Sequence, residues 1–181
     1  SPQEVLRVPG PDGVRETTLH ALEIAPDTFE GEGLRHLTGA SLLDLLPERE
    51  QLFAGVRVRR RAFMPRGSGA VVFLYDVLSR DPVALRLGGF FVDRDMHAVH
   101  EQVPGLTFHA AGREVTVQGE AQTRVQVHEP GAVIDPLDPR PLAQRVHYRH
   151  DLARGEPDTE YTLGTPLWEL SFPAGGGRAA L

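Results

Sequence analysis

The sequence predicts a mainly β fold with a minor α part: an antiparallel barrel or sandwich of about 8–10 strands with one or two short helices. Three observations lead to this fold class. Apolar and polar residues alternate over many short segments, which is the period of a half-buried strand. Turns rich in glycine and proline separate these segments at short intervals. Strands so close together in the sequence favour antiparallel pairing.

The chain opens with a predicted β-hairpin. Its first strand covers residues 4–8 and its second covers residues 14–24. Residues 9–13 between them contain two prolines and two glycines, which supply the restricted and the positive φ values of a tight turn.

The strongest helix signal begins at Ser41. An acidic residue follows three positions later, as in a weak capping box, and three leucines then fall on one helical face. We therefore predict a short helix from Ser41 to Leu46. Pro47 either ends this helix or opens a second short one that runs to Phe53.

From Gly55 onward the period of two returns. Val56 and Val58 alternate with arginines, as a half-buried strand requires. Residues 70–78 are apolar enough for a central strand that is covered on both faces. Alternation resumes over residues 83–87 and predicts another strand.

The second half of the chain adds one predicted helix and several strands. Residues 93–103 carry apolar side chains at helical spacing. The clearest hairpin follows, with strands at residues 115–118 and 124–127. Two more strands are predicted at residues 143–150 and 161–172, where Trp168 and its alternate neighbours share one face.

The elements predict a single globular domain over residues 1–172. A chain of 181 residues is long enough to bury one continuous core, and no composition change marks a convincing boundary. Three consecutive glycines at 175–177 lead into the last residues, which predicts a flexible C-terminal tail over residues 173–181.

Two residue types are missing, and their absence excludes several chemistries. All 19 basic residues are arginine, so Schiff-base chemistry, a Walker-type phosphate loop and a catalytic lysine are excluded. The chain has no cysteine, which excludes disulfides, thiolate nucleophiles and thiolate metal sites. Cofactor attachment through lysine or cysteine is therefore excluded as well.

Charge and hydropathy narrow the predicted partners and compartment. The net charge of −6 makes nucleic acid an unfavourable partner. No apolar run approaches the roughly 20 residues of a transmembrane helix. No signal peptide is visible, which predicts a cytoplasmic protein, although a mature exported chain also fits.

Two histidines and a glutamate are the first candidates for chemistry. His97, His100 and Glu101 occupy positions i, i+3 and i+4 of the predicted helix, so they share one face. This spacing predicts a divalent metal site, and the same three residues are the predicted catalytic groups. The alternative is that they are ordinary surface or packing side chains.

A row of arginines is the second candidate. Alternation puts Arg57, Arg59 and Arg61 on one face of their strand, where guanidinium groups bind carboxylates or phosphates. These three are therefore predicted ligand-binding residues for an anion. The alternative is that they pair with aspartates and glutamates on neighbouring strands.

Tyr75 and Trp168 complete the predicted ligand site. A β-barrel of this size holds a small molecule, and aromatic side chains on its strands would line the cavity. The alternative is that both residues belong to the ordinary hydrophobic core.

These observations leave two classes of function open. The first is a small-molecule-binding β-barrel, of lyase or isomerase type, that acts on an anionic ligand. The second is a non-catalytic interaction module that docks a protein partner through the arginine-lined sheet face or an edge strand. The direction of the arginine row separates them, since a row inside a cavity favours the first class and a row on an open sheet face favours the second.

Overall fold

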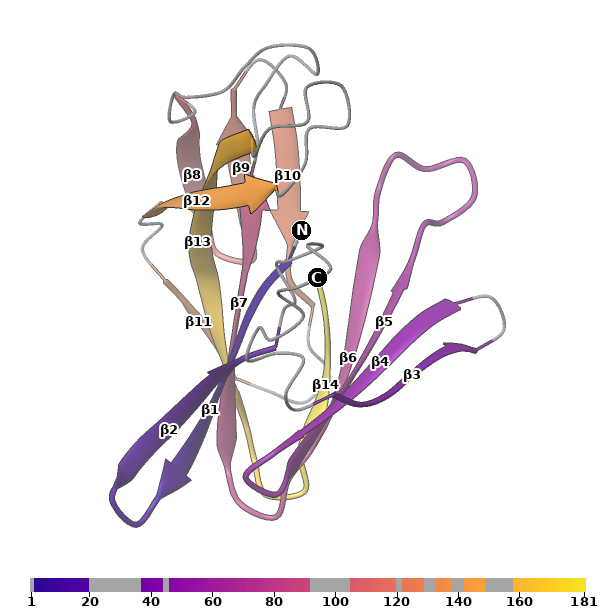
Figure 1. Cartoon of the computed structure of the whole chain (residues 1–181), viewed down its shortest axis with the longest axis vertical. Helices are drawn as coiled ribbons and strands as arrows, with labels where there is room; N and C mark the ends of the chain where they lie inside the picture. Colours follow the sequence, from indigo (N-terminus) through magenta and orange to yellow (C-terminus); the bar gives the residue numbers. More distant parts are fainter. Residues whose placement is uncertain are drawn as a thin grey trace.

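The computed structural model describes residues 2–19, 37–43, 46–91, 105–119, 122–128, 133–137, 142–148 and 158–181. Within these ranges the chain forms fourteen strands and no helix. The strands pair antiparallel and make three sheets (Figure 1). The predicted mainly β, antiparallel fold is confirmed, and its arrangement is sandwich-like and not a closed barrel.

The largest sheet has six strands and lies on the left of Figure 1. Its order is β11–β13–β7–β1–β2, and β12 pairs with a separate stretch of the long β13. The predicted N-terminal hairpin is present as β1 and β2. The six strands are β1 (Pro2–Gly10), β2 (Gly13–Thr18), β7 (Val83–Phe91), β11 (Val133–Pro136), β12 (Leu142–Tyr148) and β13 (Asp158–Phe172).

The second sheet has five strands in the order β14–β6–β5–β4–β3 and lies on the right of Figure 1. Four of its strands are consecutive in the sequence and pair with their chain neighbours, whereas β14 comes from the C-terminal end. The strands are β3 (Leu37–Leu43), β4 (Leu46–Phe53), β5 (Val56–Phe63), β6 (Val72–Leu78) and β14 (Gly177–Ala180).

A third, smaller sheet consists of β8 (Thr107–Ala111), β9 (Glu114–Gln118) and β10 (Gln122–Gln126), with β9 in the middle. The indole Nε1 of Trp168 donates a hydrogen bond of 3.0 Å to the Gly112 carbonyl, which joins this sheet to the six-stranded one. The backbone of His128, just after β10, pairs with Ala180 of β14. The small sheet is thus tied to both larger sheets.

Alternation along the strands builds the core. On β13, Trp168, Leu170 and Phe172 share a buried face, as predicted, and lie opposite alternate residues of β7. A register shift at Leu167 breaks the alternation there, and both Leu167 and Trp168 are fully buried. Such a bulge lets two consecutive side chains be buried on one strand.

The predicted helix between Ser41 and Phe53 is wrong, because the described residues of this range belong to β3 and β4. In the pairing of β4 with β5, Glu48 lies opposite Arg61 and the next outward glutamate lies opposite the next arginine. Opposite charges on facing positions stabilise a strand pair, and they outweigh the helical spacing of the leucines here. The other predicted helix, at residues 93–103, lies outside the described residues. The described residues include no helix able to cross a membrane.

The C-terminal residues differ from the predicted flexible tail. Gly177–Ala180 forms β14, which pairs with β6, and Ala179 is buried. The turn before it requires glycine, because a Cβ on Gly176 would lie 1.9 Å from the carbonyl oxygen of Val77 and the φ of Gly176 is 84°. The glycines therefore allow a close approach to β6.

β6 is a central strand, as predicted, but the described residues cover only one of its faces. Tyr75 and Val77 on the inner face are buried, whereas Leu78 on the outer face is 57% exposed. The outer face of the five-stranded sheet therefore presents apolar side chains that the described residues leave open.

Candidate functional site

The arginine row lies on β5, on the outer face of the five-stranded sheet. Val56 and Val58 of the same strand point inward and are buried. By alternation Arg57, Arg59 and Arg61 share the opposite face, as the sequence predicts. The row thus lies on an open sheet face and not inside a barrel.

Carboxylates on the neighbouring strands pair with this row. Arg61 Nε lies 2.7 Å from Glu48 Oε2, and Arg59 Nη2 lies 2.9 Å from Glu50 Oε2. Asp76 on β6 lies 3.4 Å from Arg61 Nη2. The hydrogen bond to Glu50 is the main cause of the raised pKa of Arg59. The cross-strand pairing that the sequence offered as an alternative is therefore present.

A shallow groove of about 520 Å³ lies on this face. The arginine row borders it on β5, and the glycine turn with Arg178 borders it on β14. Since β6 lies between these two strands, Asp76 and Leu78 form the floor. The groove therefore has an apolar and acidic floor between basic rims.

Arg57 and Arg178 are the most accessible cations of the groove. The side chains of Arg57 and Arg178 are 51% and 78% exposed. Each makes an ion pair through Nε, Arg57 at 3.8 Å from Glu50 and Arg178 at 2.9 Å from Asp76. Both side chains nevertheless keep much of their surface accessible to solvent. They are open to an anionic group from outside.

Tyr75 and Trp168, the predicted ligand-lining aromatics, lie in the packed core. Their exposed fractions are 2% and 0%, and both contact protein groups there, as the alternative of an ordinary core predicts. The Tyr75 hydroxyl donates a hydrogen bond of 2.8 Å to Glu4. Burial, with the nearby charge of Glu4, raises the pKa of Tyr75 well above its usual range. Tyr75 is therefore a permanent hydrogen-bond donor to this carboxylate.

Sequence reasoning missed a buried ionic cluster centred on Glu4, which is 1% exposed. Its Oε1 accepts hydrogen bonds from Tyr75 and from Arg60 Nη1 at 2.9 Å, and its Oε2 accepts one from Arg49 Nη2 at 3.1 Å. Arg49 also donates to the carbonyl of Leu19. Burial, reinforced by the charge of Arg60, lowers the pKa of Arg49. Three strands of the five-stranded sheet thus converge on one carboxylate of β1.

The sequence contains a signal for this cluster. Glu4 alternates with Leu6 and Val8, so it occupies a core-facing position, and Arg60 follows Val56 and Val58 on their inward face. A charged residue at a core-facing position requires a partner of opposite charge. Two such residues of opposite sign on the inner faces of different strands predict a buried ion pair.

The predicted metal and catalytic residues His97, His100 and Glu101 lie outside the described residues. His109 and His128, whose side chains the structure describes, are exposed, and the described residues contain no group of three or more histidine, aspartate or glutamate side chains that could hold a metal ion. The metal site and the catalytic roles therefore stay predictions.

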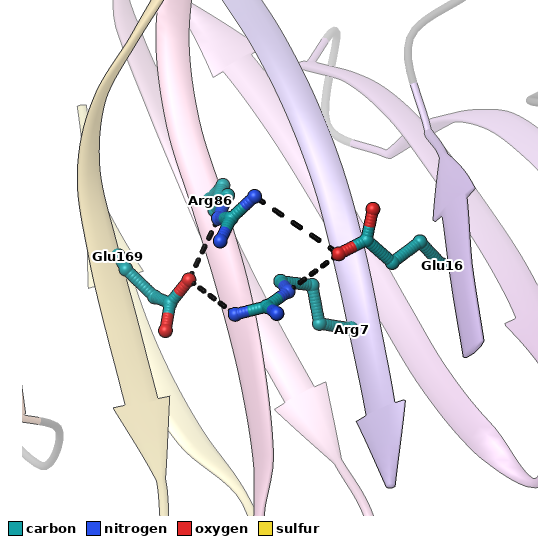
Figure 2. Close-up of polar contacts among 4 residues, drawn as sticks. All are labelled: Arg7, Glu16, Arg86 and Glu169. Atoms are coloured by element: carbon teal, nitrogen blue, oxygen red, sulfur yellow. Dashed lines mark hydrogen bonds and ion pairs between the residues drawn. The ribbon is translucent and has the colours of Figure 1, made fainter. Parts of the chain in front are cut away.

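A second ionic network lies on the outer face of the six-stranded sheet (Figure 2). Glu169 Oε2 lies 2.7 Å from Arg7 Nη1 and 2.7 Å from Arg86 Nε, and Glu16 lies 2.7 Å from Arg7 Nε. Burial opposes the charge of Glu169, but the hydrogen bonds from both arginines outweigh it and lower the pKa of Glu169. Two arginines and two glutamates from four strands thus balance one another.

Comparison with known proteins assigns a family to this fold. Residues 12–177 match the family described as glycogen debranching enzyme N terminal. No curated protein matches the sequence. Among solved structures, a polysaccharide lyase matches with a TM-score of 0.44 and 12% identity, over 98% of this chain and 24% of that chain, so this chain spans about a quarter of that protein. Because the family match covers most of its length, this chain belongs to the family of glycogen debranching enzyme N-terminal domains, a β domain of carbohydrate-processing enzymes.

Proposed function

We propose that this chain is the non-catalytic N-terminal β domain of a glycogen debranching enzyme and that it acts as an interaction module. In this proposal it docks against the rest of that enzyme through the outer face of the five-stranded sheet. The observation that carries the proposal is the arginine row, which lies on an open face beside a shallow groove. Arginine is enriched at protein interfaces, where it combines charge with a long apolar stem.

The carboxylates of the outer faces support a non-catalytic role. Glycoside hydrolysis uses two carboxyl groups, one of which must carry a proton for the leaving group. Glu48, Glu50 and Asp76 are each in an ion pair with arginine, and the pKa of Glu169 is lowered. The lowered pKa makes Glu169 a poor proton donor, and the arginine pairs of the other three carboxylates give them a structural role.

The groove supports a second candidate function, the binding of a small anionic ligand. Its lining contains four arginines and one aspartate, and a guanidinium group binds carboxylates and phosphates through paired hydrogen bonds. In this version of the proposal Arg57, Arg59 and Arg61 orient the anion. The groove is open, so the ligand would stay partly in contact with water.

The test uses two separate proteins, this chain and the C-terminal region of a glycogen debranching enzyme of the same family. We expect this chain alone to leave glycogen intact and the two proteins to form a complex in sedimentation velocity. Replacing Arg59 with alanine should weaken the complex, with circular dichroism to confirm that the variant is folded. Debranching of glycogen by this chain alone would refute the non-catalytic role. Absence of a complex at about 100 µM of each protein would refute docking.

A further inference from the structure

We infer that the surface which docks on this domain is acidic and carries an apolar side chain. Its carboxylates would bind between Arg57 and Arg178, and its apolar side chain would cover Leu52 and Leu78. This inference rests on the proposed function, because it names the chemistry of the partner at the same face.

The apolar part of the inference comes from one row across three strands. Leu52 of β4 lies opposite Arg57 of β5, and Arg57 lies opposite Leu78 of β6. The two leucines are 46% and 57% exposed. Single exposed leucines are common. Here, however, two exposed leucines flank the half-exposed Arg57, and one of them, Leu78, lies on β6, whose apolar sequence is typical of a strand covered on both faces. Covering this row would remove apolar area from water, which is what stabilises the centre of an interface.

The charge part of the inference comes from the contrast between the groove and the whole chain. The chain has a net charge of −6, yet the groove is lined by four arginines and one aspartate. Counting the neighbouring Glu48 and Glu50, four cations face three anions, an excess of one positive charge. Arg57 and Arg178 are the most exposed of the four arginines, so this excess is most accessible to a partner there. Carboxylates of a partner would form ion pairs with these two arginines.

The same charges argue against a second copy of this chain as the partner. A symmetric dimer through this face would set one arginine row against another. Each copy also carries a net charge of −6, so the two copies repel at long range. An acidic surface of a different protein region would instead set carboxylates against the arginine row.

The experiment measures binding of the same debranching enzyme C-terminal region at about 50, 150 and 500 mM NaCl. The first variant combines Arg57→Glu with Arg178→Glu, two exposed positions that should not disturb the core. The matched control combines Arg15→Glu with Arg124→Glu, which changes the net charge equally at exposed positions on β2 and β10. A third variant, Leu78→Ser, tests the apolar contact without changing charge.

We expect the Arg57/Arg178 variant to weaken binding at least about tenfold at low salt and to lose most of the salt dependence of the native protein. The control should change affinity less than about twofold. Leu78→Ser should weaken binding at every salt concentration, since burial of apolar surface is not screened by salt. Circular dichroism and thermal unfolding would confirm that each variant is folded.

The outcomes separate this inference from the proposed function. If a complex forms but the Arg57/Arg178 variant binds as the control does, the acidic partner surface is refuted and docking through some other face stands. If no complex forms with the native chain, docking itself is refuted. A third outcome is that calorimetry shows inorganic phosphate binding to the native chain but not to the Arg57/Arg178 variant, while both proteins bind the partner equally. The groove would then bind a small anion, and the inference would be wrong.

Discussion

Two carboxylates of the six-stranded sheet are each held by two arginines, and they differ chiefly in burial. Glu4 faces the five-stranded sheet and is 1% exposed, with Arg49 and Arg60 as its partners. Glu169 faces outward and is 20% exposed, with the two arginines of Figure 2 as its partners. The Glu4 cluster joins two sheets, whereas the Glu169 network joins strands within one sheet.

The comparison shows that similar ion pairs have different consequences at different depths. If the carboxylate of Glu169 is removed, water can solvate the arginines, because these side chains are 24% and 33% exposed. If the carboxylate of Glu4 is removed, Arg49 is left with a side chain that is only 14% exposed. A buried charge without its partner is costly, so the inner cluster should dominate stability.

The largest expected effect is that of Glu4→Ala. The substitution leaves two arginines and the Tyr75 hydroxyl without their common acceptor, and we expect the free energy of unfolding to fall by about 3–5 kcal/mol. Urea denaturation followed by tryptophan fluorescence measures it, because Trp168 is the single tryptophan and is buried. If Glu4→Ala does not fold, Glu4→Gln, which keeps the shape of the side chain, should fold with a smaller loss.

The matched comparison is Glu169→Ala, the same substitution in the outer network. We expect a loss of about 1 kcal/mol or less, because both arginine partners are partly hydrated and solvent screens their charges. Equal losses for Glu4→Ala and Glu169→Ala would show that burial does not set the difference between the two networks.

A smaller effect is expected for Tyr75→Phe. This substitution removes the 2.8 Å hydrogen bond to Glu4 but leaves both arginines paired with the carboxylate. A hydrogen bond to a charged group contributes about 1.5–3 kcal/mol, and we expect a loss near the lower end because Glu4 keeps its other donors. A loss as large as that of Glu4→Ala would mean that the tyrosine, and not the ion pairs, holds the cluster together.

The smallest effect concerns the pH dependence of the Glu169 network. The folded pKa of Glu169 lies below its ordinary value of 4.5, so the stability it contributes is present above that value and is lost as the pH falls through the folded pKa. Glu169→Gln should therefore be less stable than the native chain at about pH 7, and the difference should shrink as the pH falls toward about 3. Urea denaturation of both proteins at several pH values tests this. A difference that grows toward low pH would have the wrong sign for a lowered pKa.

Alternation made several elements predictable. The β1–β2 hairpin, the strand that begins at Val56 and the buried face of Trp168 follow from a period of two that any single strand displays. β3 and β4 were missed because their leucines also fit a helix, and the arginines that pair with their glutamates lie on the next strand. β14 was not predicted because a run of glycines is typical of a flexible segment, and the sequence does not show that these glycines approach β6.

The candidate site was predictable only in part, because it too depends on strands and residues that are distant in the sequence. Strand alternation placed the arginine row on one face, but its position over an open groove depends on β6 and β14 as neighbours. The partners of Glu4 lie 45, 56 and 71 positions away along the chain. No local pattern specifies which of the many charges at such separations will meet.

The sequence by itself therefore determined the fold class, the faces of several strands and the exclusion of lysine and cysteine chemistry, because these depend on composition and on neighbours within a few residues. The tertiary structure decided that the sheets do not close into a barrel, that Tyr75 and Trp168 are buried, and that Glu4 lies between two arginines. These outcomes depend on strand order and register, which are set by contacts between distant segments.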